Sequence, residues 1–177
     1  MDKIIAAVRS EREFENAVNS KVSIIFDLSP DILELSSRII TAHKANKKLF
    51  IHMDLASGIG KDKSGIIYLK KLGVDGIIST RVNIIKTARE IGVITVQRFF
   101  IVDSQSLTSA IETVALSKPD IVEVMPGLAV KVLKKIHEKT NIPLIAGGLI
   151  ENTEEVNEVL SSGAVSVSTG ISELWNM

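Results

Sequence analysis

Residues 143–156 read PLIAGGLIENTEEV, and this stretch contains one complete junction between a strand and a helix. The apolar run that begins at Pro143 predicts a short buried strand, and NTEEV predicts a helix start with acidic residues in its first turn. Between them stand Gly147 and Gly148, which offer no side chain for packing. Two adjacent glycines here indicate either a sharp turn or the close approach of another group to the backbone.

The same pattern of a strand followed by a helix repeats along the chain. Short β-branched runs alternate with longer amphipathic segments, and Gly73, Gly92 and Gly163 stand where helices should end. We expect strands at residues 4–8, 22–27, 49–54, 76–79, 94–99, 121–125, 143–147 and 164–168. We expect helices at residues 11–20, 30–46, 64–73, 83–92, 107–118, 129–140 and 153–163.

Eight strands that alternate with helices predict an α/β fold with a parallel sheet covered by helices. Eight equal units favour closure into a (β/α)8 TIM barrel, and an open, doubly wound sheet is the alternative. We expect one compact barrel domain over residues 1–177, with a final helix truncated to ISELWNM. Trp175 in that segment is expected to be a packing plug or a contact between subunits.

The composition is that of an ordinary globular protein. Hydrophobic residues make up 45%, 21 basic residues balance 21 acidic ones, and cysteine is absent. These values argue against a disulfide framework, a catalytic thiol, a zinc–thiolate site and a wholly basic nucleic-acid binder. The N-terminal segment is too short and too charged for a signal peptide, and no apolar run is long enough to span a bilayer. We therefore predict a cytoplasmic protein that has no contact with a membrane.

The loops after the seventh and eighth strands predict a phosphate site. In a TIM barrel, ligands bind at the carboxyl ends of the strands, and these two loops often hold a phosphate. Free backbone N–H groups and a short helix start favour an anion, and nearby hydroxyls add donors. The predicted phosphate site consists of Gly147, Gly148, Leu149, Ser168, Thr169, Gly170 and Ser172. In the alternative, the two glycines only turn the chain.

Polar residues at other strand ends predict a pocket beside the phosphate site. His52 and Asp54 are two residues apart, so both should point to one side of their strand, with His52 as a hydrogen-bonded core histidine. Arg98 is a cation in an apolar run and needs an anionic partner, for which Glu123 is the candidate. This pair is either purely structural or part of a ligand pocket. Asp27 either holds a ligand hydroxyl or caps the next helix.

The residues that catalysis would need are less distinct. No strand ends in the lysine that a Schiff-base aldolase requires, and no cluster has a clear metal-ligand spacing. We predict no catalytic residue, no metal site and no cofactor. The alternative function is a small barrel enzyme, an isomerase or a lyase for a phosphorylated substrate, with Asp54 or Glu123 as its base.

Several motifs stand at the predicted strand ends. They are HMDL (52–55), DGIIST (75–80), QRFFIVDS (97–104), EVMPG (123–127) and AGGLI (146–150). Together with IIAAVRSEREFENAV (4–18), they resemble the glycerol uptake operon antiterminator family over nearly the whole chain. The resemblance implies a regulatory protein that responds to glycerol 3-phosphate. It also implies binding to leader mRNA and transcription antitermination ahead of genes for glycerol catabolism.

The resemblance implies a small phosphate ligand, glycerol 3-phosphate or a similar compound, on the predicted glycine loops. Its hydroxyls would face Asp27, Asp54, Arg98 or Glu123. Leader mRNA is a partner by resemblance only, and a homo-oligomer is a further expectation. The basic segments 44–48, 61–63, 70–71 and 131–135 and Arg81 are candidates for RNA contact, although each is by default a solvated helix face.

Overall fold

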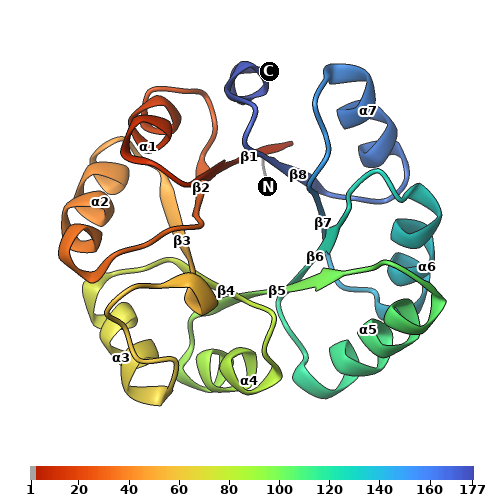
Figure 1. Cartoon of the computed structure of the whole chain (residues 1–177), viewed down its shortest axis with the longest axis horizontal. Helices are drawn as coiled ribbons and strands as arrows, with labels where there is room; N and C mark the ends of the chain where they lie inside the picture. Colours follow the sequence, from red (N-terminus) through yellow and green to blue (C-terminus); the bar gives the residue numbers. More distant parts are fainter. Residues whose placement is uncertain (1–2) are drawn as a thin grey trace.

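The structure, a computed structural model, describes residues 3–177 and contains a closed barrel of parallel strands. The strands pair in chain order, and β8 returns to pair with β1, as Figure 1 shows. They are β1 (Ile4–Val8), β2 (Ile24–Asp27), β3 (Lys48–His52), β4 (Gly76–Ser79), β5 (Ile94–Phe100), β6 (Ile121–Met125), β7 (Leu144–Gly147) and β8 (Ser166–Thr169). The predicted TIM barrel is confirmed, because the β1–β8 pairing excludes an open sheet.

Helices cover the outside of this barrel. They are α1 (Glu11–Val18), α2 (Ile32–Lys44), α3 (Lys63–Leu72), α4 (Val82–Ile91), α5 (Ser104–Ser117), α6 (Val130–Thr140) and α7 (Thr153–Ser161). Two short 3-10 helices, η1 (Met53–Leu55) and η2 (Ser172–Asn176), complete the fold. Local sequence sets these boundaries: Ser10 and Glu13 form a capping box at α1, and left-handed Gly73 and Gly92 end α3 and α4.

The short helix η2 takes the place that an eighth α-helix would have in the ring. Figure 1 shows η2 between α1 and α7, beside the start of the barrel. Trp175 of η2 is 1% exposed, and its indole N–H donates to the carbonyl of Thr169 at 2.9 Å. Trp175 is therefore a packing residue that covers the junction of the first and last strands.

The core has two layers, because successive strand residues point alternately into the lumen and toward the helices. Phe26, Phe50 and Ile78 belong to the cluster inside the lumen, where the two phenylalanine rings stack with centroids 5.6 Å apart. Ile25 and Leu49 belong to the larger cluster between strands and helices. Most strand residues on both faces are therefore buried, and the exposed ones, such as Lys48, Ile94 and Phe100, stand at strand ends.

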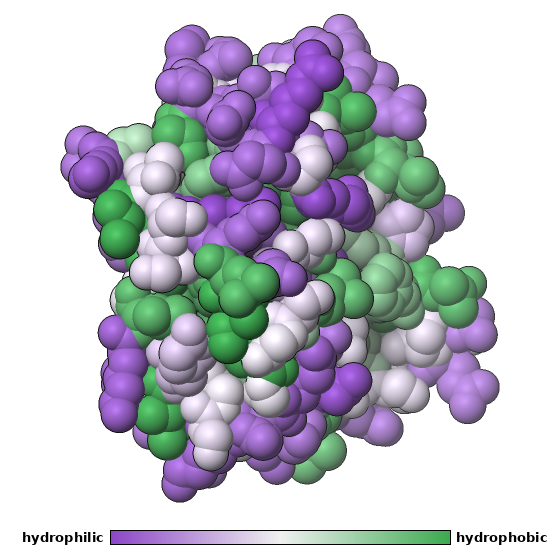
Figure 2. Space-filling view, turned by 60° about the vertical axis from the view of Figure 1, so that its left-hand side comes forward, coloured by the Kyte–Doolittle hydropathy of each residue, from purple (hydrophilic) through white to green (hydrophobic). Residues whose placement is uncertain are grey.

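The outer surface over α1, α2 and α3 is mostly hydrophilic, and its apolar residues form small groups (Figure 2). Leu33 and Ile40 of α2 and Tyr68 of α3 are among the exposed apolar side chains. Within residues 3–177, no helix is long and apolar enough to cross a membrane.

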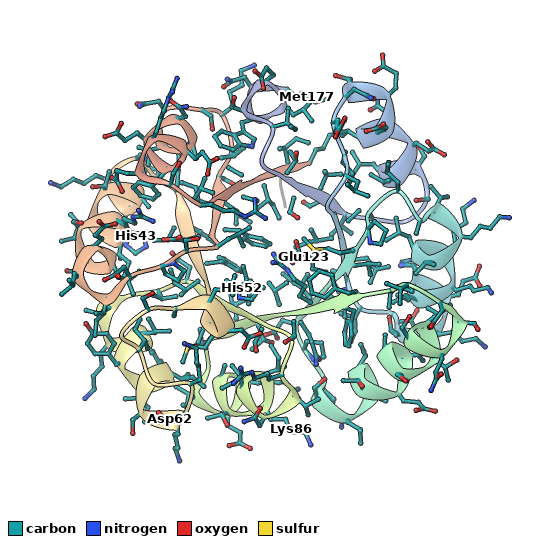
Figure 3. All side chains as sticks on the ribbon, viewed as in Figure 1. His43, His52, Asp62, Lys86, Glu123 and Met177 are labelled. Carbon is teal, nitrogen blue, oxygen red and sulfur yellow. The ribbon has the colours of Figure 1, made fainter. Side chains whose placement is uncertain are left out.

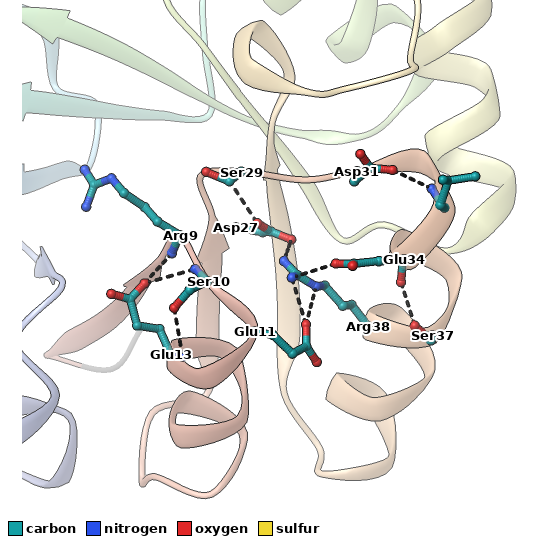
Figure 4. A network of polar contacts seen from close by, with 11 residues as sticks. Arg9, Ser10, Glu11, Glu13, Asp27, Ser29, Asp31, Glu34, Ser37 and Arg38 are labelled. Atoms are coloured by element: carbon teal, nitrogen blue, oxygen red, sulfur yellow. Dashed lines mark hydrogen bonds and ion pairs between the residues drawn. The ribbon is translucent and has the colours of Figure 1, made fainter.

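Arg38 of α2 is the centre of a buried ionic network that joins β2, α1 and α2 (Figure 4). Its guanidinium pairs with Asp27 at 2.9 Å, with Glu11 at 2.8 Å and with Glu34 at 3.0 Å. It also lies 5.3 Å from the centre of the Phe14 ring. Asp27 is fully buried, whereas the side chains of Glu11 and Glu34 are each 58% exposed. The pair with Asp27 should therefore dominate the network.

We expect Asp27→Asn to lower the free energy of unfolding by about 3 kcal/mol, because it removes the main counter-charge of a buried guanidinium. Glu34→Gln is the matched control, and we expect it to cost less than about 1 kcal/mol because Glu34 is exposed. Urea unfolding followed by circular dichroism measures both variants. Equal losses in the two variants would contradict the dominant role of the Asp27 pair.

Candidate ligand site

A hydrogen-bonded triad of β5, β6 and β8 residues spans the lumen near the carboxyl ends of the strands. The Arg98 Nε–H donates to Glu123 Oε2 at 2.6 Å, and the Ser168 hydroxyl donates to Glu123 Oε1 at 2.6 Å. All three side chains are buried. The predicted ion pair of Arg98 and Glu123 is confirmed, and the carboxylate of Glu123 has both oxygens occupied.

His52 belongs to the same layer of the lumen. Figure 3 shows His52 and Glu123 near the centre of the ring of strands, whereas His43, Asp62 and Lys86 lie at the periphery. Burial, together with the positive charge of Arg98, lowers the pKa of His52 to about 4, so the ring is neutral at pH 7.

Two buried nitrogens of this layer lack a protein partner. Among residues 3–177, no group forms a hydrogen bond with His52 Nδ1 or with Arg98 Nη2. His52 is a buried core histidine, as expected, but its Nδ1 has no hydrogen-bond partner among these residues. Buried polar atoms without a protein partner are uncommon, so both nitrogens are candidates for contact with a water or a ligand.

Asp54 does not lie beside His52 in the lumen, because β3 ends at His52 and the chain then turns into η1. Its Oδ1 accepts from the Ser79 hydroxyl at 2.7 Å, and its Oδ2 accepts from the Thr80 N–H and hydroxyl at 2.7 and 2.9 Å. Burial acts to raise the pKa of Asp54, but the hydrogen bonds from Thr80 and Ser79 outweigh it and lower the pKa. The carboxylate therefore joins the loop after β3 to the loop after β4.

Asp27 also lies outside the lumen. Phe26 points inward and Ile25 outward, so Asp27 points outward, toward Arg38. Its second oxygen accepts from the Ser29 N–H at 3.1 Å. The expectation that Asp27 shares a pocket with Glu123 is therefore wrong. Within residues 3–177, no group of three or more His, Asp or Glu side chains is placed to hold a metal ion.

The two glycines of the AGGLI motif are needed for different reasons. A Cβ at Gly147 would lie 2.6 Å from Ser168 Oγ and 2.8 Å from Glu123 Oε1, so a side chain would displace the triad. Gly148 has room for a Cβ, which would lie 3.8 Å from Met125, but its φ is +76°. Gly147 thus permits a close approach, and Gly148 makes the turn. Leu149 follows with a φ of +61°, a strained value for a leucine.

The loop after β6 rests directly on this turn. The Gly127 N–H donates to the carbonyls of Gly147 at 2.6 Å and Gly148 at 3.2 Å. A Cβ at Gly127 would lie 2.6 Å from the Ile150 side chain. The EVMPG and AGGLI motifs are therefore parts of one packed unit.

A cavity of about 220 Å³ opens between the loops after β1, β7 and β8. Of the predicted phosphate residues, five line it: Gly148, Leu149, Ser168, Thr169 and Gly170. The hydroxyl of Thr169 is engaged inside the protein, because it donates to the Ile150 carbonyl at 3.1 Å and accepts from the Ile171 N–H at 3.1 Å. The backbone N–H groups of Gly148 and Gly170 are therefore better candidates for donors to a phosphate.

Two predicted phosphate residues lie elsewhere. Gly147 faces the triad and is absent from the cavity lining. Ser172 lines a separate hollow between α1 and η2, and its hydroxyl donates to Glu173 at 3.2 Å. The expectation that Ser172 joins the other loop residues is wrong, because η2 turns away from the cavity to cover the strands.

Arg9 also lines the cavity, and the sequence prediction missed it. Its guanidinium lies 4.0 Å from the position of a Cβ on Gly170, and it forms no ion pair with any of residues 3–177. Only its backbone is held, because the N–H donates to Glu13 at 2.6 Å. In Figure 4 the Arg9 side chain points away from the Arg38 network. The sequence could have indicated this role, since Arg9 directly follows the first strand and so stands at a strand's carboxyl end.

The comparisons with known proteins agree with the resemblance. Residues 4–175 match the model of the family described as glycerol-3-phosphate responsive antiterminator. The glycerol uptake operon antiterminator regulatory protein of Listeria monocytogenes has a similar crystal structure. It is 33% identical, with a TM-score of 0.93, and the match covers 98% of this chain and 95% of that chain.

Two further relatives cover the chain equally well. The crystal structure of a glycerol uptake operon antiterminator-related protein from Thermotoga maritima is 33% identical, with a TM-score of 0.89 and 99% of both chains covered. The uncharacterized protein YgcP of Escherichia coli K12 is 37% identical over 175 residues, which are 98% of this chain and 92% of that protein. The chain therefore belongs to the glycerol-3-phosphate-responsive antiterminator family.

Proposed function

We propose that this chain senses glycerol 3-phosphate in the cytoplasm and, by binding leader mRNA, promotes transcription antitermination of genes for glycerol catabolism. The observation that carries the proposal is the cavity between the loops after β1, β7 and β8. Arg9, which has no ion-pair partner among the described residues, lines this cavity. A phosphate group suits such a site, because Arg9 supplies charge and glycine backbone N–H groups approach without steric hindrance. The name of the family supports the choice of glycerol 3-phosphate.

The triad adjoins the cavity at Ser168, and it suits the glycerol end of the ligand. Ser168 lines the cavity and is bonded to Glu123, which in turn holds Arg98. The unpaired Arg98 Nη2 is a donor, and His52 Nδ1 is a donor or an acceptor according to its tautomer. We propose that ligand hydroxyls take these two positions, whereas Asp27 and Asp54 only support the fold.

The barrel enzyme is the less favoured alternative. A general base needs a carboxylate that is free to take a proton near the substrate. Both oxygens of Glu123 are bonded, to Arg98 and Ser168, and both oxygens of Asp54 are bonded, to Ser79 and Thr80. The lowered pKa of Asp54 also makes it a weaker base. These contacts favour a binding protein over an isomerase or a lyase.

A sensor also needs two states that bind the ligand unequally. The loops after β6 and β7 are joined through Gly127, and the second of them contains the strained Leu149, whose side chain is 67% exposed. We propose that the ligand favours one arrangement of these loops.

We expect Arg9→Gln to weaken the binding of glycerol 3-phosphate at least about tenfold, because a charge-assisted hydrogen bond to the phosphate is lost. Arg12→Gln is the matched control, since Arg12 is exposed on α1 and does not line the cavity. Titration calorimetry measures both, with glycerol and inorganic phosphate as control ligands. Equal affinities for the two variants would overturn this phosphate site.

We expect the protein with glycerol 3-phosphate to increase read-through of a terminator in the leader RNA, because the ligand selects the active state. Arg9→Gln should need at least about ten times more ligand for the same read-through, in line with its weaker binding. Transcription in vitro with purified polymerase measures the effect. Turnover of glycerol 3-phosphate that is abolished by Asp54→Asn would instead favour the enzyme.

A further inference from the structure

The chain has no net charge, but the barrel places the first turns of its helices at one end and their last turns at the other. All seven helices run in the same direction, so their last turns lie around the amino ends of the strands, opposite the ligand cavity. Cations are favoured at helix C-termini and acids at N-termini. Arg89 and Lys139 stand in last turns, whereas Glu11, Glu34 and Glu154 stand in first turns. The last turns of α2, α3, α4 and α6 therefore bring cations to the face opposite the cavity, which we call the basic face.

The basic face contains a hollow of about 500 Å³ between the ends of α4, α5 and α6. Three exposed cations line it, Arg89, Lys118 and Lys139, each from the end of a different helix. Apolar residues lie between them: Ile111, Val114, Ala115, Pro119 and Ile142. Exposed cations beside apolar surface suit a phosphodiester with an attached sugar and base.

One acid, Asp120, also lines this hollow, but it is engaged on the protein side. Its carboxylate accepts from the Thr95 N–H at 2.8 Å and from the Thr95 hydroxyl at 2.7 Å. It therefore leaves the three cations without a side-chain partner among the described residues.

The basic surface continues from the hollow toward α2. The ammonium of Lys70 donates to the carbonyl of Ile91, which joins the ends of α3 and α4. On the other side of α3, a Cβ on Gly73 would lie 3.8 Å from the His43 ring of α2. Exposed Lys71 and Lys44 stand in the last turns of α3 and α2, so cations follow one another along this edge of the barrel.

We propose that this face binds RNA, with a nucleotide in the hollow and the neighbouring phosphates on Arg89, Lys118 and Lys139. The inference rests on the proposed function, because antitermination on a leader transcript requires an RNA contact. Three cations line the hollow, whereas Arg9 is the one cation that lines the ligand cavity, so the hollow is the better site for a phosphate backbone. RNA and glycerol 3-phosphate then bind opposite ends of the barrel and do not compete for one site.

The test compares two variants that lose the same charge. The hollow variant carries Arg89→Gln, Lys118→Asn and Lys139→Gln, and asparagine suits residue 118 because Lys118 is left-handed with a φ of +50°. The control variant carries Lys131→Gln, Lys134→Gln and Lys135→Gln, which are exposed positions on α6 outside the hollow. The probes are a labelled leader transcript with a terminator hairpin and an oligo(U) strand of equal length. Calorimetry with glycerol 3-phosphate verifies that each variant is folded.

We expect the hollow variant to bind the leader transcript at least about tenfold more weakly and to lower the slope of log K against log salt by about 2, because three phosphate contacts are lost. The control variant should bind as the wild type does. Unchanged affinity of the hollow variant would overturn the inference and leave the proposed function intact. Normal RNA affinity with lost read-through would assign this face to the transcription machinery and also overturn it. Absence of RNA binding by the wild type would contradict both proposals.

Discussion

The position of Glu123 inside the barrel constrains everything around the candidate site. A carboxylate buried in the lumen must be neutralised and hydrogen-bonded, and Arg98 and Ser168 do both. The hydrogen bond between Glu123 and Ser168 passes so close to β7 that only glycine fits at residue 147. Gly127 then packs on the carbonyls of that turn, so the loops after β6, β7 and β8 are fixed relative to one another.

The periodicity of the sequence was sufficient to predict the fold, and the reason is physical. Each helix has its own capping residues, and each strand is a short apolar run between two helices, so eight repeats could be counted without knowing any contact. For Trp175 the sequence left a packing role and a subunit contact open, and its burial in the structure supports packing.

The candidate site was predicted only in part, because most residues on both faces of the barrel strands are buried. An apolar pattern such as that of β2 does not reveal which residues face the lumen, and Asp27 was therefore assigned to the wrong side. For Asp54 the error was the predicted end of the third strand. The strand ends at His52 rather than at residue 54, so Asp54 lies in the segment that follows it. Arg9 was missed because the phosphate was assigned only to the loops after β7 and β8. The loop after β1, which contains Arg9, lies beside them in the closed barrel. The pair of Arg98 and Glu123 was predictable, since a buried charge requires a partner.

In the proposed function, ligand binding at one end of the barrel must change RNA binding at the other end. The candidate ligand cavity lies among the loops at one end of the barrel, and the basic hollow lies among the helix ends at the other. The strands connect the two ends. A ligand at one end can alter RNA binding at the other only if it favours one arrangement of this shared frame. The joined loops after β6 and β7 lead directly into α6 and α7, and α6 carries Lys139 of the hollow.

The most direct test of the central claim is a crystal structure of the protein with glycerol 3-phosphate. We expect the phosphate between Gly148 and Gly170, with its oxygens within about 4 Å of the Arg9 guanidinium. The glycerol hydroxyls should point toward His52 and Arg98. A phosphate bound in the hollow at Arg89, Lys118 and Lys139, with the cavity beside Arg9 left to solvent, would contradict it.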